Sequence, residues 1–426
     1  MQWVKMKNPK PKDKTAGIFL LKQKVMRNTC KIMQNMLYLN TYDSFDQIKG
    51  ERTMLESALP TPCYLIDQAK LKENLIMLDA LRQRSGCRIL YSQKAFSSFP
   101  FYSMIARYLD GAASCSAYEA QLAHLFFHGE NHVCETAYLP DEVDQLVEIC
   151  DHMIFNSPSQ LAKYGVFART HSISVGLRVN PEYKSQQIDE FDPCAQFSRL
   201  GTTIAEFPMT QRRNINGLLV HALFEQNSDA LVRLTDAFIE KFGALLPDME
   251  WVNLGGGHHL TREGYQMEQF EETVAMLQRK YGLKVYIEPG EAIVWEAGFF
   301  VTSVVDIIQN EIPIAILDSS AVCHAPDITE LRYRPPIIGA EKASVLPHTY
   351  RLGGRSCLPE DVFGDYSFDH KLEIGERIVF RDMAINTLTK AKMYTGMPMP
   401  AVAVREMDGN CKLLRNFGFS DFKNRF

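Results

Sequence analysis

The chain has 426 residues, of which 46% are hydrophobic and 23% are charged, and its net charge at pH 7 is −5. This length favours two domains, and the acidic balance argues against a broad nucleic-acid-binding surface. No apolar run approaches the roughly 20 residues that span a bilayer. The 10 cysteines include no Cys-x-x-Cys pair, which is typical of reduced thiols. We therefore expect a cytoplasmic protein without a metal site.

The first 53 residues differ in composition from the rest of the chain. They carry eleven lysines and arginines against four acidic residues. Their short apolar piece, 17–21, lacks the small-residue cleavage site of a secretory signal. This composition favours a disordered tail, or an upstream start codon with Met54 as the true first residue. A transit peptide is the alternative, although serine is scarce.

From residue 88 onward, short apolar runs alternate with stretches of helical periodicity. One such stretch is 229–246, whose leucines and phenylalanines fall on one helix face. Eight repeated strand–helix units predict a closed, parallel (β/α)₈ barrel. The segment 181–216 is long and polar and shows no clear helix pattern. The predicted strands are 89–92, 111–115, 134–138, 152–156, 175–180, 217–223, 249–254 and 284–287.

The alternation of strands and helices ends after Glu291, and the remaining residues favour a β-rich domain. We divide the chain into an extension (1–53), a barrel domain (54–295) and a C-terminal β-rich domain (296–426). A first strand at about 61–66 is expected to join the β-rich domain. The other strands predicted there are 299–308, 313–317, 349–352, 377–381 and 401–405.

Chemically useful side chains follow several barrel strands, at the end where barrel enzymes place their active sites. Lys94 follows the first predicted strand, and His221 lies within the sixth, near its end. Most lysines are solvated surface residues. A partly desolvated lysine at a barrel mouth is different, because a lowered pKa gives a free amine that can condense with an aldehyde.

Two further features fit such an aldehyde cofactor. The Gly255-Gly256-Gly257 run follows the seventh strand, where backbone N–H groups can surround a phosphate, although a glycine run is more often a plain turn. Glu288 follows the eighth strand, and a carboxylate there can keep a pyridine nitrogen protonated. The flat ring of His221 can stack on the cofactor, although a lone histidine in an apolar run is more often structural.

Several stretches of the sequence are motifs of one enzyme family. The chain from about Leu59 to Arg425 resembles the carboxynorspermidine and carboxyspermidine decarboxylases. These are fold-type III pyridoxal-phosphate (PLP) enzymes, related to ornithine and diaminopimelate decarboxylases and to alanine racemase. The motifs are Thr61-Pro62-Cys63-Tyr64, Asp192-Pro193-Cys194-Ala195, Ser198-Arg199-Leu200-Gly201, Glu225-Gln226-Asn227-Ser228-Asp229, Gly255-Gly256-Gly257-His258-His259, Glu288-Pro289-Gly290-Glu291-Ala292, Cys323-His324 with Pro326-Asp327, and Thr349-Tyr350-Arg351-Leu352-Gly353-Gly354.

The resemblance implies a role for each candidate residue and a role in polyamine biosynthesis, yielding norspermidine or spermidine. It also implies a homodimer in which the β-rich domain of one chain closes over the barrel mouth of the other. The implied substrate is cationic with one carboxylate, so its amines suit acidic side chains in the pocket. Related decarboxylases often have an arginine where this chain has Glu291, and this replacement changes the local charge in favour of a cationic ligand. The implied residues are Lys94 as the Schiff-base lysine; Cys357 as the proton donor to the substrate α-carbon; His221, Gly255, Gly256, Gly257, Glu288 and Asn386 as cofactor contacts; and Glu225, Glu291, Asp327 and Asp361 as substrate contacts.

The chain also departs from the family pattern near the predicted pocket. Ile385-Asn386-Thr387 stands where the family usually has His-Tyr-Thr, and Asn386 replaces only part of the tyrosine's contact with the cofactor region. Ala222 and Phe224 depart in the stretch after His221. The substrate therefore stays open. The alternatives are ornithine, arginine, diaminopimelate, a specialised precursor, or a non-catalytic PLP-binding relative. A racemase is disfavoured, because racemases of this fold place an arginine near the pyridine nitrogen.

Overall fold

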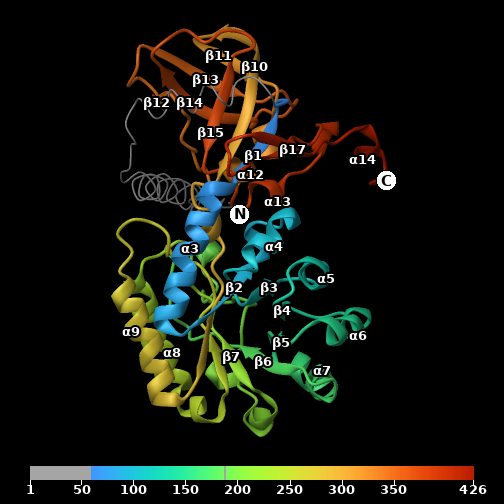
Figure 1. Ribbon diagram of the computed structural model, residues 1–426, viewed down its shortest axis with the longest axis vertical. Coiled ribbons are helices and arrows are strands. Elements are labelled where there is room, and N and C mark those ends of the chain that lie inside the picture. The colour runs from blue at the N-terminus through green and yellow to red at the C-terminus, as the bar shows by residue number, and fades with distance from the viewer. Residues whose placement is uncertain (1–58, 187–188) are drawn as a thin grey trace, which may run out of the picture.

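The structure is a computed structural model that describes residues 59–186 and 189–426. It contains a closed parallel barrel and a separate, mostly antiparallel sheet, which lie at opposite ends of the molecule in Figure 1. The predicted fold class, a (β/α)₈ barrel with a β-rich domain, is confirmed. The predicted features of residues 1–53 lie outside the described residues.

The barrel is built from eight parallel strands, each paired with the next along the chain. It closes where the first strand pairs with the last, Arg88 opposite Tyr286 and Ile89 opposite Ile287. All eight strand–helix repeats of the sequence therefore contribute a strand. The strands are β2 (Arg88–Ser92), β3 (Gly111–Ser114), β4 (Glu130–Cys134), β5 (His152–Phe155), β6 (Ser174–Arg178), β7 (Gly217–Leu219), β8 (Trp251–Asn253) and β9 (Lys284–Ile287).

One barrel strand lies at a different place in the sequence from the one we predicted. The prediction was 134–138, but β4 runs from Glu130 to Cys134. We predicted the strand in the residues that follow β4 because these include the apolar Ala137 and Tyr138. The true strand carries Glu130 and His132, two polar residues that the sequence pattern did not mark as buried. Tertiary pairing with β3 and β5 overrides that local pattern.

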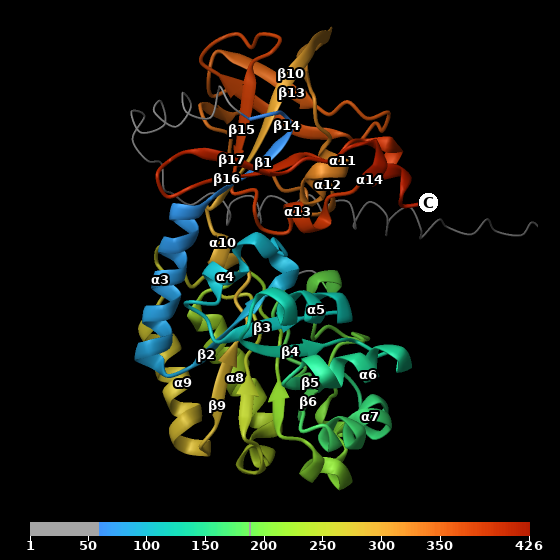
Figure 2. The same ribbon diagram turned by 45° about the vertical axis from the view of Figure 1, so that its right-hand side comes forward.

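Helices cover the outside of the barrel in Figures 1 and 2. The helix predicted at 229–246 is α8 (Ser228–Phe242), followed by a 3₁₀ helix (Gly243–Asp248). The described part of 181–216 contains only 3₁₀ helices, in agreement with its weak helical pattern. The remaining helices of the barrel region are α3 (Gln68–Ser85), α4 (Tyr102–Ile105), α5 (Ala117–Phe126), α6 (Pro140–Ile149), α7 (Pro158–Thr170), α9 (Met267–Tyr281) and α10 (Glu291–Val294).

The second sheet combines strands from both ends of the described chain. Strand β1 (Cys63–Asp67) pairs antiparallel with β10 (Gly298–Asn310) and parallel with β16 (Ala401–Arg405). The first half of β10 is buried and pairs with β1 and β15, whereas its second half pairs with β11. The other strands are β11 (Ile312–Leu317), β12 (Ala340–Lys342), β13 (His348–Gly353), β14 (Val362–Phe368), β15 (Arg377–Arg381) and β17 (Cys411–Arg415).

Three strands of this sheet, β12, β14 and β17, were not predicted. They are short or interrupted by polar residues, such as Gly364 and Asp365 in β14. The short helices of this domain are α11 (Ala321–His324), α12 (Pro326–Glu330), α13 (Thr387–Lys390) and α14 (Phe419–Lys423), of which α12 and α13 contribute residues to the candidate site. Among the described residues, no helix is long and apolar enough to cross a membrane.

Side chains fill the interior of the barrel. One buried cluster contains Leu90, Ile154, Leu219, Trp251 and Tyr286. A Cβ atom on Gly217 would lie 2.0 Å from the ring of Trp251, so the tryptophan can enter the barrel only because residue 217 has no side chain. The interior is thus a packed core, and polar chemistry is confined to the two ends of the barrel.

Candidate functional site

Lys94 lies on a 3₁₀ turn that directly follows strand β2, at the C-terminal mouth of the barrel. Its neighbour Gln93 is completely buried and fixes this turn, because its side chain donates to Ser114 Oγ at 2.7 Å and accepts from the hydroxyl of Tyr102 at 2.8 Å. From the sheet domain, the hydroxyl of Thr389 donates to the carbonyl oxygen of Lys94 at 3.3 Å. The Lys94 side chain itself is exposed in the single chain, whereas we expected partial desolvation.

His221 and Glu288 meet at the same mouth, after strands β7 and β9. His221 Nδ1 lies 3.6 Å from Glu288 Oε2, and Asn253 Nδ2 donates to Glu288 Oε1 at 2.7 Å. The N–H group of Gly256 donates to His221 Nδ1 at 3.3 Å. Nδ1 of His221 therefore faces both the Gly256 N–H and the Glu288 carboxylate.

The charges at the mouth follow from these contacts. Burial and the positive charge of Lys94 lower the pKa of His221 to about 4, which agrees with a neutral ring at pH 7. Burial alone would raise the pKa of Glu288. The contact with His221, the charge of Lys94 and the hydrogen bond from Asn253 outweigh burial, and the pKa of Glu288 is lowered. Glu288 is therefore an anion that can keep a pyridine nitrogen protonated.

The three glycines lie against the backbone and His221, where side chains would not fit. A Cβ on Gly256 would lie 2.3 Å from the carbonyl oxygen of Glu288, and one on Gly255 would lie 2.8 Å from the His221 ring. The backbone N–H groups of Gly257 and His258 have no hydrogen-bond partner among the described residues. Unpaired N–H groups beside a side-chain-free backbone suit a phosphate.

These observations test whether PLP fits the mouth. Lys94 offers an amine, Glu288 an anionic partner for the ring nitrogen, His221 a neutral flat ring and the glycine run two free N–H donors. Each of these groups matches one part of the cofactor, so the residues present fit PLP.

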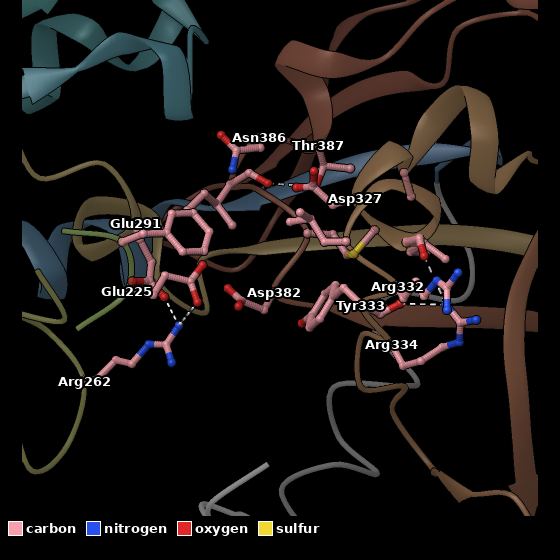
Figure 3. A pocket seen from close by; sticks show the side chains of 16 residues that line it. Glu225, Arg262, Glu291, Asp327, Arg332, Tyr333, Arg334, Asp382, Asn386 and Thr387 are labelled. Carbon is pink, nitrogen blue, oxygen red and sulfur yellow. Dashed lines mark hydrogen bonds and ion pairs between the residues drawn. The ribbon is translucent and has the colours of Figure 1, made fainter. Parts of the chain in front are cut away.

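A pocket opens beside this mouth, between the barrel and the sheet domain (Figure 3). The sheet domain provides most of its lining. The barrel contributes residues that follow β7, β8 and β9. The lining residues are Phe224, Glu225, Arg262, Glu291, Ala325, Asp327, Ile328, Leu331, Arg332, Tyr333, Arg334, Asp382, Met383, Ile385, Asn386 and Thr387.

Glu291, a predicted substrate contact, is already paired within the chain. The carboxylate contacts the Arg262 guanidinium, and His259 Nδ1 lies 2.8 Å from Glu291 Oε2. The guanidinium also lies 3.9 Å from the centre of the Trp295 ring. Arg262 was not predicted, because nothing in its local sequence distinguishes it from a surface arginine.

Two other carboxylates of the pocket are less firmly paired. Arg262 Nη2 lies 3.5 Å from Glu225 Oε2, and burial raises the pKa of Glu225. Asp382 follows strand β15 and accepts a hydrogen bond from the Glu296 N–H at 3.0 Å. Burial raises the pKa of Asp382 to about 6. Asp382 was not predicted, although its place directly after a predicted strand was a usable signal.

Asp327 and Asn386 come from the short helices of the sheet domain. The carboxylate of Asp327 contacts Lys390 Nζ, so this acid is also partly neutralised. Asn386 lies at the start of α13, and its N–H donates to the carbonyl oxygen of Ala95 at 2.7 Å. This bond joins Asn386 to the residue next to Lys94 and links the pocket to the barrel mouth.

Cys357 and Asp361 do not join this pocket within the single chain. Cys357 is exposed on the loop between β13 and β14 and is not among the described residues that line the pocket. Asp361 is buried under that loop. Its carboxylate accepts from the N–H groups of Ala321 at 2.7 Å and Ser356 at 3.0 Å. Asp361 therefore holds the loop that carries Cys357.

Comparisons with known proteins agree with this geometry. A family model described as pyridoxal-dependent decarboxylase, C-terminal sheet domain, matches residues 39–384. A protein of Synechocystis sp. named carboxyaminopropylagmatine decarboxylase is 37% identical over 371 residues, which cover 87% of this chain and 96% of that protein. A Campylobacter jejuni protein named carboxynorspermidine/carboxyspermidine decarboxylase is 35% identical over 383 residues, covering 87% of this chain and 100% of that protein.

Solved structures give the same result. The crystal structure of carboxynorspermidine decarboxylase from Campylobacter jejuni, complexed with norspermidine, matches with a TM-score of 0.81 at 35% identity, over 86% of this chain and 100% of that one. Diaminopimelate decarboxylase from Helicobacter pylori matches with a TM-score of 0.75 at 17% identity, over 88% of this chain and 98% of that one, and at that identity it shows the shared fold. Together these matches show that the chain belongs to the pyridoxal-dependent decarboxylase family.

Proposed function

We propose that the protein is a PLP-dependent decarboxylase of carboxynorspermidine or carboxyspermidine, with norspermidine or spermidine as the product. The observation that carries this proposal is the pocket beside Lys94, in which the carboxylates of Glu225, Asp327 and Asp382 come together from two domains. Such a pocket suits a flexible chain of amines, because buried carboxylates gain most from a cationic partner. The 35% identity to enzymes named for these substrates supports the same choice.

The barrel residues would hold the cofactor and set its charge. Bound PLP would accept the electron pair that the departing carboxylate leaves behind. Lys94 would attach the cofactor covalently, and the free N–H groups of Gly257 and His258 would bind its phosphate. Glu288, held as an anion by Asn253, would keep the pyridine nitrogen protonated. The neutral ring of His221 would lie against the cofactor face and exclude water from it.

The sheet domain would bind the substrate and return the proton. Asp382 of the sheet domain would pair with a distal amine of the substrate, together with Glu225, which the barrel contributes. Cys357 would donate the proton that replaces the carboxylate on the α-carbon. Asp361 would act by positioning the Cys357 loop rather than by touching the substrate, since its carboxylate already binds Ala321 and Ser356.

We further propose that the active site is shared between two subunits of a cytoplasmic homodimer. Two features of the single chain support this. Lys94 is exposed although it would hold the cofactor, and Cys357 is exposed and outside the pocket. A partner subunit that presents its Cys357 loop to the barrel mouth would cover both residues.

A second candidate substrate is carboxyaminopropylagmatine. The observation that favours it is the 37% identity to the Synechocystis protein of that name. This substrate ends in a guanidinium, whereas carboxynorspermidine ends in an amine. The guanidinium of Arg262 already occupies the ring face of Trp295 and the carboxylate of Glu291, so neither group is free to stack on or pair with the planar guanidinium of a substrate. This contact favours the amine-terminated substrates.

The decisive experiment is mass spectrometry of the products formed by the purified, PLP-loaded protein. The substrates offered singly are carboxynorspermidine, carboxyspermidine, carboxyaminopropylagmatine, ornithine, arginine and diaminopimelate. We expect norspermidine or spermidine to form with the highest kcat/KM. Agmatine-derived product at a higher kcat/KM would replace our first choice with the second. No product from any of the six would favour a non-catalytic PLP-binding relative.

A further inference from the structure

The N-terminal end of the barrel, opposite the candidate active site, contains a second cluster of polar side chains. Glu130 is the first residue of β4 and His132 the third, so both point to the same face of the strand. His152 is the first residue of β5 and pairs directly with His132 across the two strands. One potential ligand atom from each residue lies within 4.8 Å of the other two. The proposed decarboxylation gives none of these three residues a role.

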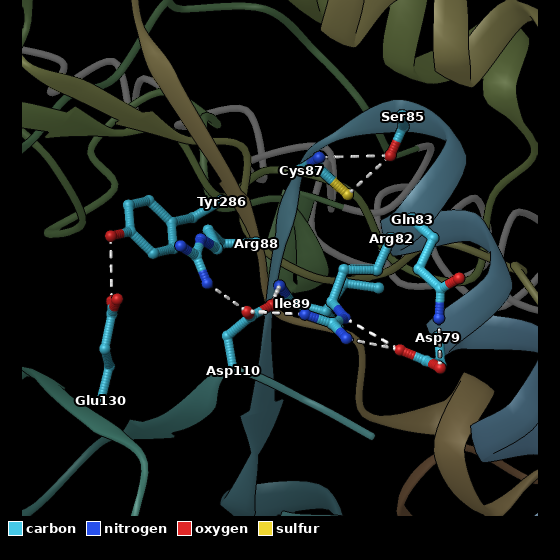
Figure 4. A network of polar contacts seen from close by, with 10 residues as sticks. All are labelled: Asp79, Arg82, Gln83, Ser85, Cys87, Arg88, Ile89, Asp110, Glu130 and Tyr286. Carbon is cyan, nitrogen blue, oxygen red and sulfur yellow. Dashed lines mark hydrogen bonds and ion pairs between the residues drawn. The ribbon is translucent and has the colours of Figure 1, made fainter. Parts of the chain in front are cut away.

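The carboxylate of Glu130 is held in place by two neighbours. His132 Nε2 lies 3.1 Å from Glu130 Oε2, and the hydroxyl of Tyr286 donates to the same oxygen at 2.9 Å. Figure 4 shows the Tyr286 contact beside the ion pairs of Asp110, which precedes β3. Burial alone would raise the pKa of Glu130, but His132 and Tyr286 outweigh it and lower the pKa to about 2. Glu130 is therefore a fixed, oriented anion.

His152 has no polar partner that explains its burial. It is only 8% exposed, and no described residue forms a hydrogen bond with either of its ring nitrogens. The Nδ1 atoms of His132 and His152 are both buried without a partner among the described residues. Burial and the neighbouring His132 lower the pKa of His152 to about 2, so the ring is neutral. A buried polar group without a partner destabilises the folded protein, whereas an apolar side chain would fill the same space without that cost.

We propose that Glu130, His132 and His152 form a binding site for one zinc-like divalent transition-metal ion. Two imidazoles and a carboxylate are ligands that Zn²⁺ favours, whereas Mg²⁺ and Ca²⁺ prefer oxygen ligands alone. Metal–ligand bonds of about 2.0–2.1 Å place tetrahedral ligands about 3.3 Å apart. The 3.1 Å between His132 Nε2 and Glu130 Oε2 already matches one such edge.

Binding would require one local movement and the transfer of one proton between the two nitrogens of His132. The rings of His132 and His152 stack with their centres 3.8 Å apart and their planes at 10°, so the His152 ring must tilt to direct a nitrogen towards the ion. The proton between His132 Nε2 and Glu130 moves to Nδ1 of the same ring by exchange with solvent, because a metal-bound imidazole nitrogen carries none. Tyr286 keeps its hydrogen bond to the carboxylate, as is usual for metal ligands. Water completes the coordination.

The site would link two neighbouring barrel strands and therefore act on stability. In barrels, the N-terminal end serves stability while the C-terminal end carries the chemistry. A metal ion shared by β4 and β5 would hold the ends of both strands together. This role is independent of the proposed decarboxylation, so either proposal can fail without the other.

The test is a metal titration of the full-length protein after removal of metals with a chelator. Zn²⁺ binding is measured by calorimetry, and Co²⁺ binding by its visible absorption. The main variant is His152→Phe, which keeps a flat ring in the stack but removes both nitrogens. Glu130→Gln keeps the side-chain shape and removes the charge. The matched control is His171→Phe, at an exposed histidine that ends helix α7.

We expect wild type and His171→Phe to bind one Zn²⁺ per chain with equal affinity. Outer partners of metal ligands contribute roughly 10–100-fold in affinity, so loss of a ligand in His152→Phe should weaken binding at least about 100-fold. Glu130→Gln should weaken Zn²⁺ binding at least about 10-fold, because it removes the charge of a ligand. If His152→Phe does not fold, the affinity of Glu130→Gln tests the proposal in its place. The proposal is overturned if folded wild type binds neither ion, or if the variants bind as tightly as the control.

Discussion

In the barrel, Glu288 is held on several sides: Asn253 donates to its carboxylate, its own N–H donates to the carbonyl oxygen of Gly255, and His221 lies 3.6 Å away. In the sheet domain, Asp382 and Asn386 lie on turns instead, both with positive φ angles, 53° and 56°. Non-glycine residues in this conformation carry backbone strain that persists where the surrounding structure maintains it.

This difference separates the two tasks of the enzyme. The barrel groups are rigid and matched to a cofactor that never changes. The sheet-domain groups lie on short helices and loops, which vary more readily than strands. Two departures of this chain from its family, Ile385 and Asn386, fall on the second group, whereas Ala222 and Phe224 follow strand β7 of the barrel. We therefore assign cofactor chemistry to the barrel and substrate selection to the sheet domain.

The strongest test of the barrel assignment is Lys94→Ala. Without the amine, covalent attachment of PLP is lost, and kcat/KM should fall at least about 1,000-fold, which corresponds to roughly 4 kcal/mol in the barrier. Wild-type protein should lose its visible absorption band on borohydride reduction, and peptide mass spectrometry should locate the label on Lys94. Lys163→Ala, on the exposed side of helix α7, should behave as wild type. A label on any other lysine would remove Lys94 from this role.

A smaller effect is expected for Glu288→Gln. PLP should stay bound, because Lys94 and the glycine run are unchanged, but a neutral amide cannot keep the pyridine nitrogen protonated. We expect kcat to fall about 100-fold, or roughly 3 kcal/mol. Single-turnover kinetics with the preferred substrate would measure it. Glu271→Gln, on the outer helix α9, is the control. Turnover near the wild-type rate in Glu288→Gln would show that Glu288 does not contact the ring.

The sequence predicted the barrel better than the sheet for a physical reason. Barrel strands are buried on both sides and separated by amphipathic helices, so their apolar runs stand out. The exception, β4, carries Glu130 and His132 into the interior, where only their pairing with neighbouring strands can place them. In the sheet, β12 and β17 have exposed positions and few residues, and their place depends on distant partners.

In the candidate site, too, residues whose position depends on distant parts of the chain could not be predicted from the sequence. Lys94, His221 and Glu288 could be found because each lies at or just beyond the end of a recognisable strand. Arg262 could not, because nothing in its local sequence distinguishes it from a surface arginine; only the fold places it against Trp295 and Glu291. The cluster of His132 and His152 was equally hidden, since its members lie on two strands and form no motif.

A test of the sheet-domain assignment uses pH. Burial raises the pKa of Asp382 to about 6, so the group is largely neutral at pH 5 and anionic at pH 7. Amines titrate near pH 10 and stay cationic throughout. The dissociation constant of norspermidine should therefore fall about 10-fold from pH 5 to pH 7, as measured by calorimetry. Asp382→Asn should lose most of this change, while Asp421→Asn should retain it. An unchanged profile in Asp382→Asn would assign the titration to another group.

The smallest expected effect is the recovery of activity in a mixture of two inactive variants. It tests whether the barrel of one subunit and the sheet domain of the other form one active site. Lys94 belongs to the barrel and Cys357 to the sheet domain, and we propose that each site takes one from either subunit. Lys94→Ala and Cys357→Ala should each be nearly inactive alone, because every site then lacks one of the two groups. Mixed under conditions of subunit exchange, half of the dimers should be heterodimers.

In each heterodimer one site would carry both defects and the other site would be intact. The mixture should therefore recover about a quarter of the wild-type activity by this statistical count. Exchange is verified separately by native mass spectrometry of chains that differ in an affinity tag. A mixture of Lys94→Ala with Glu288→Gln is the control, since both residues belong to the barrel and no intact site can form. If exchange is complete and the first mixture recovers no more than the control, Lys94 and Cys357 act within one chain, and the Cys357 loop must then reach the mouth of its own barrel.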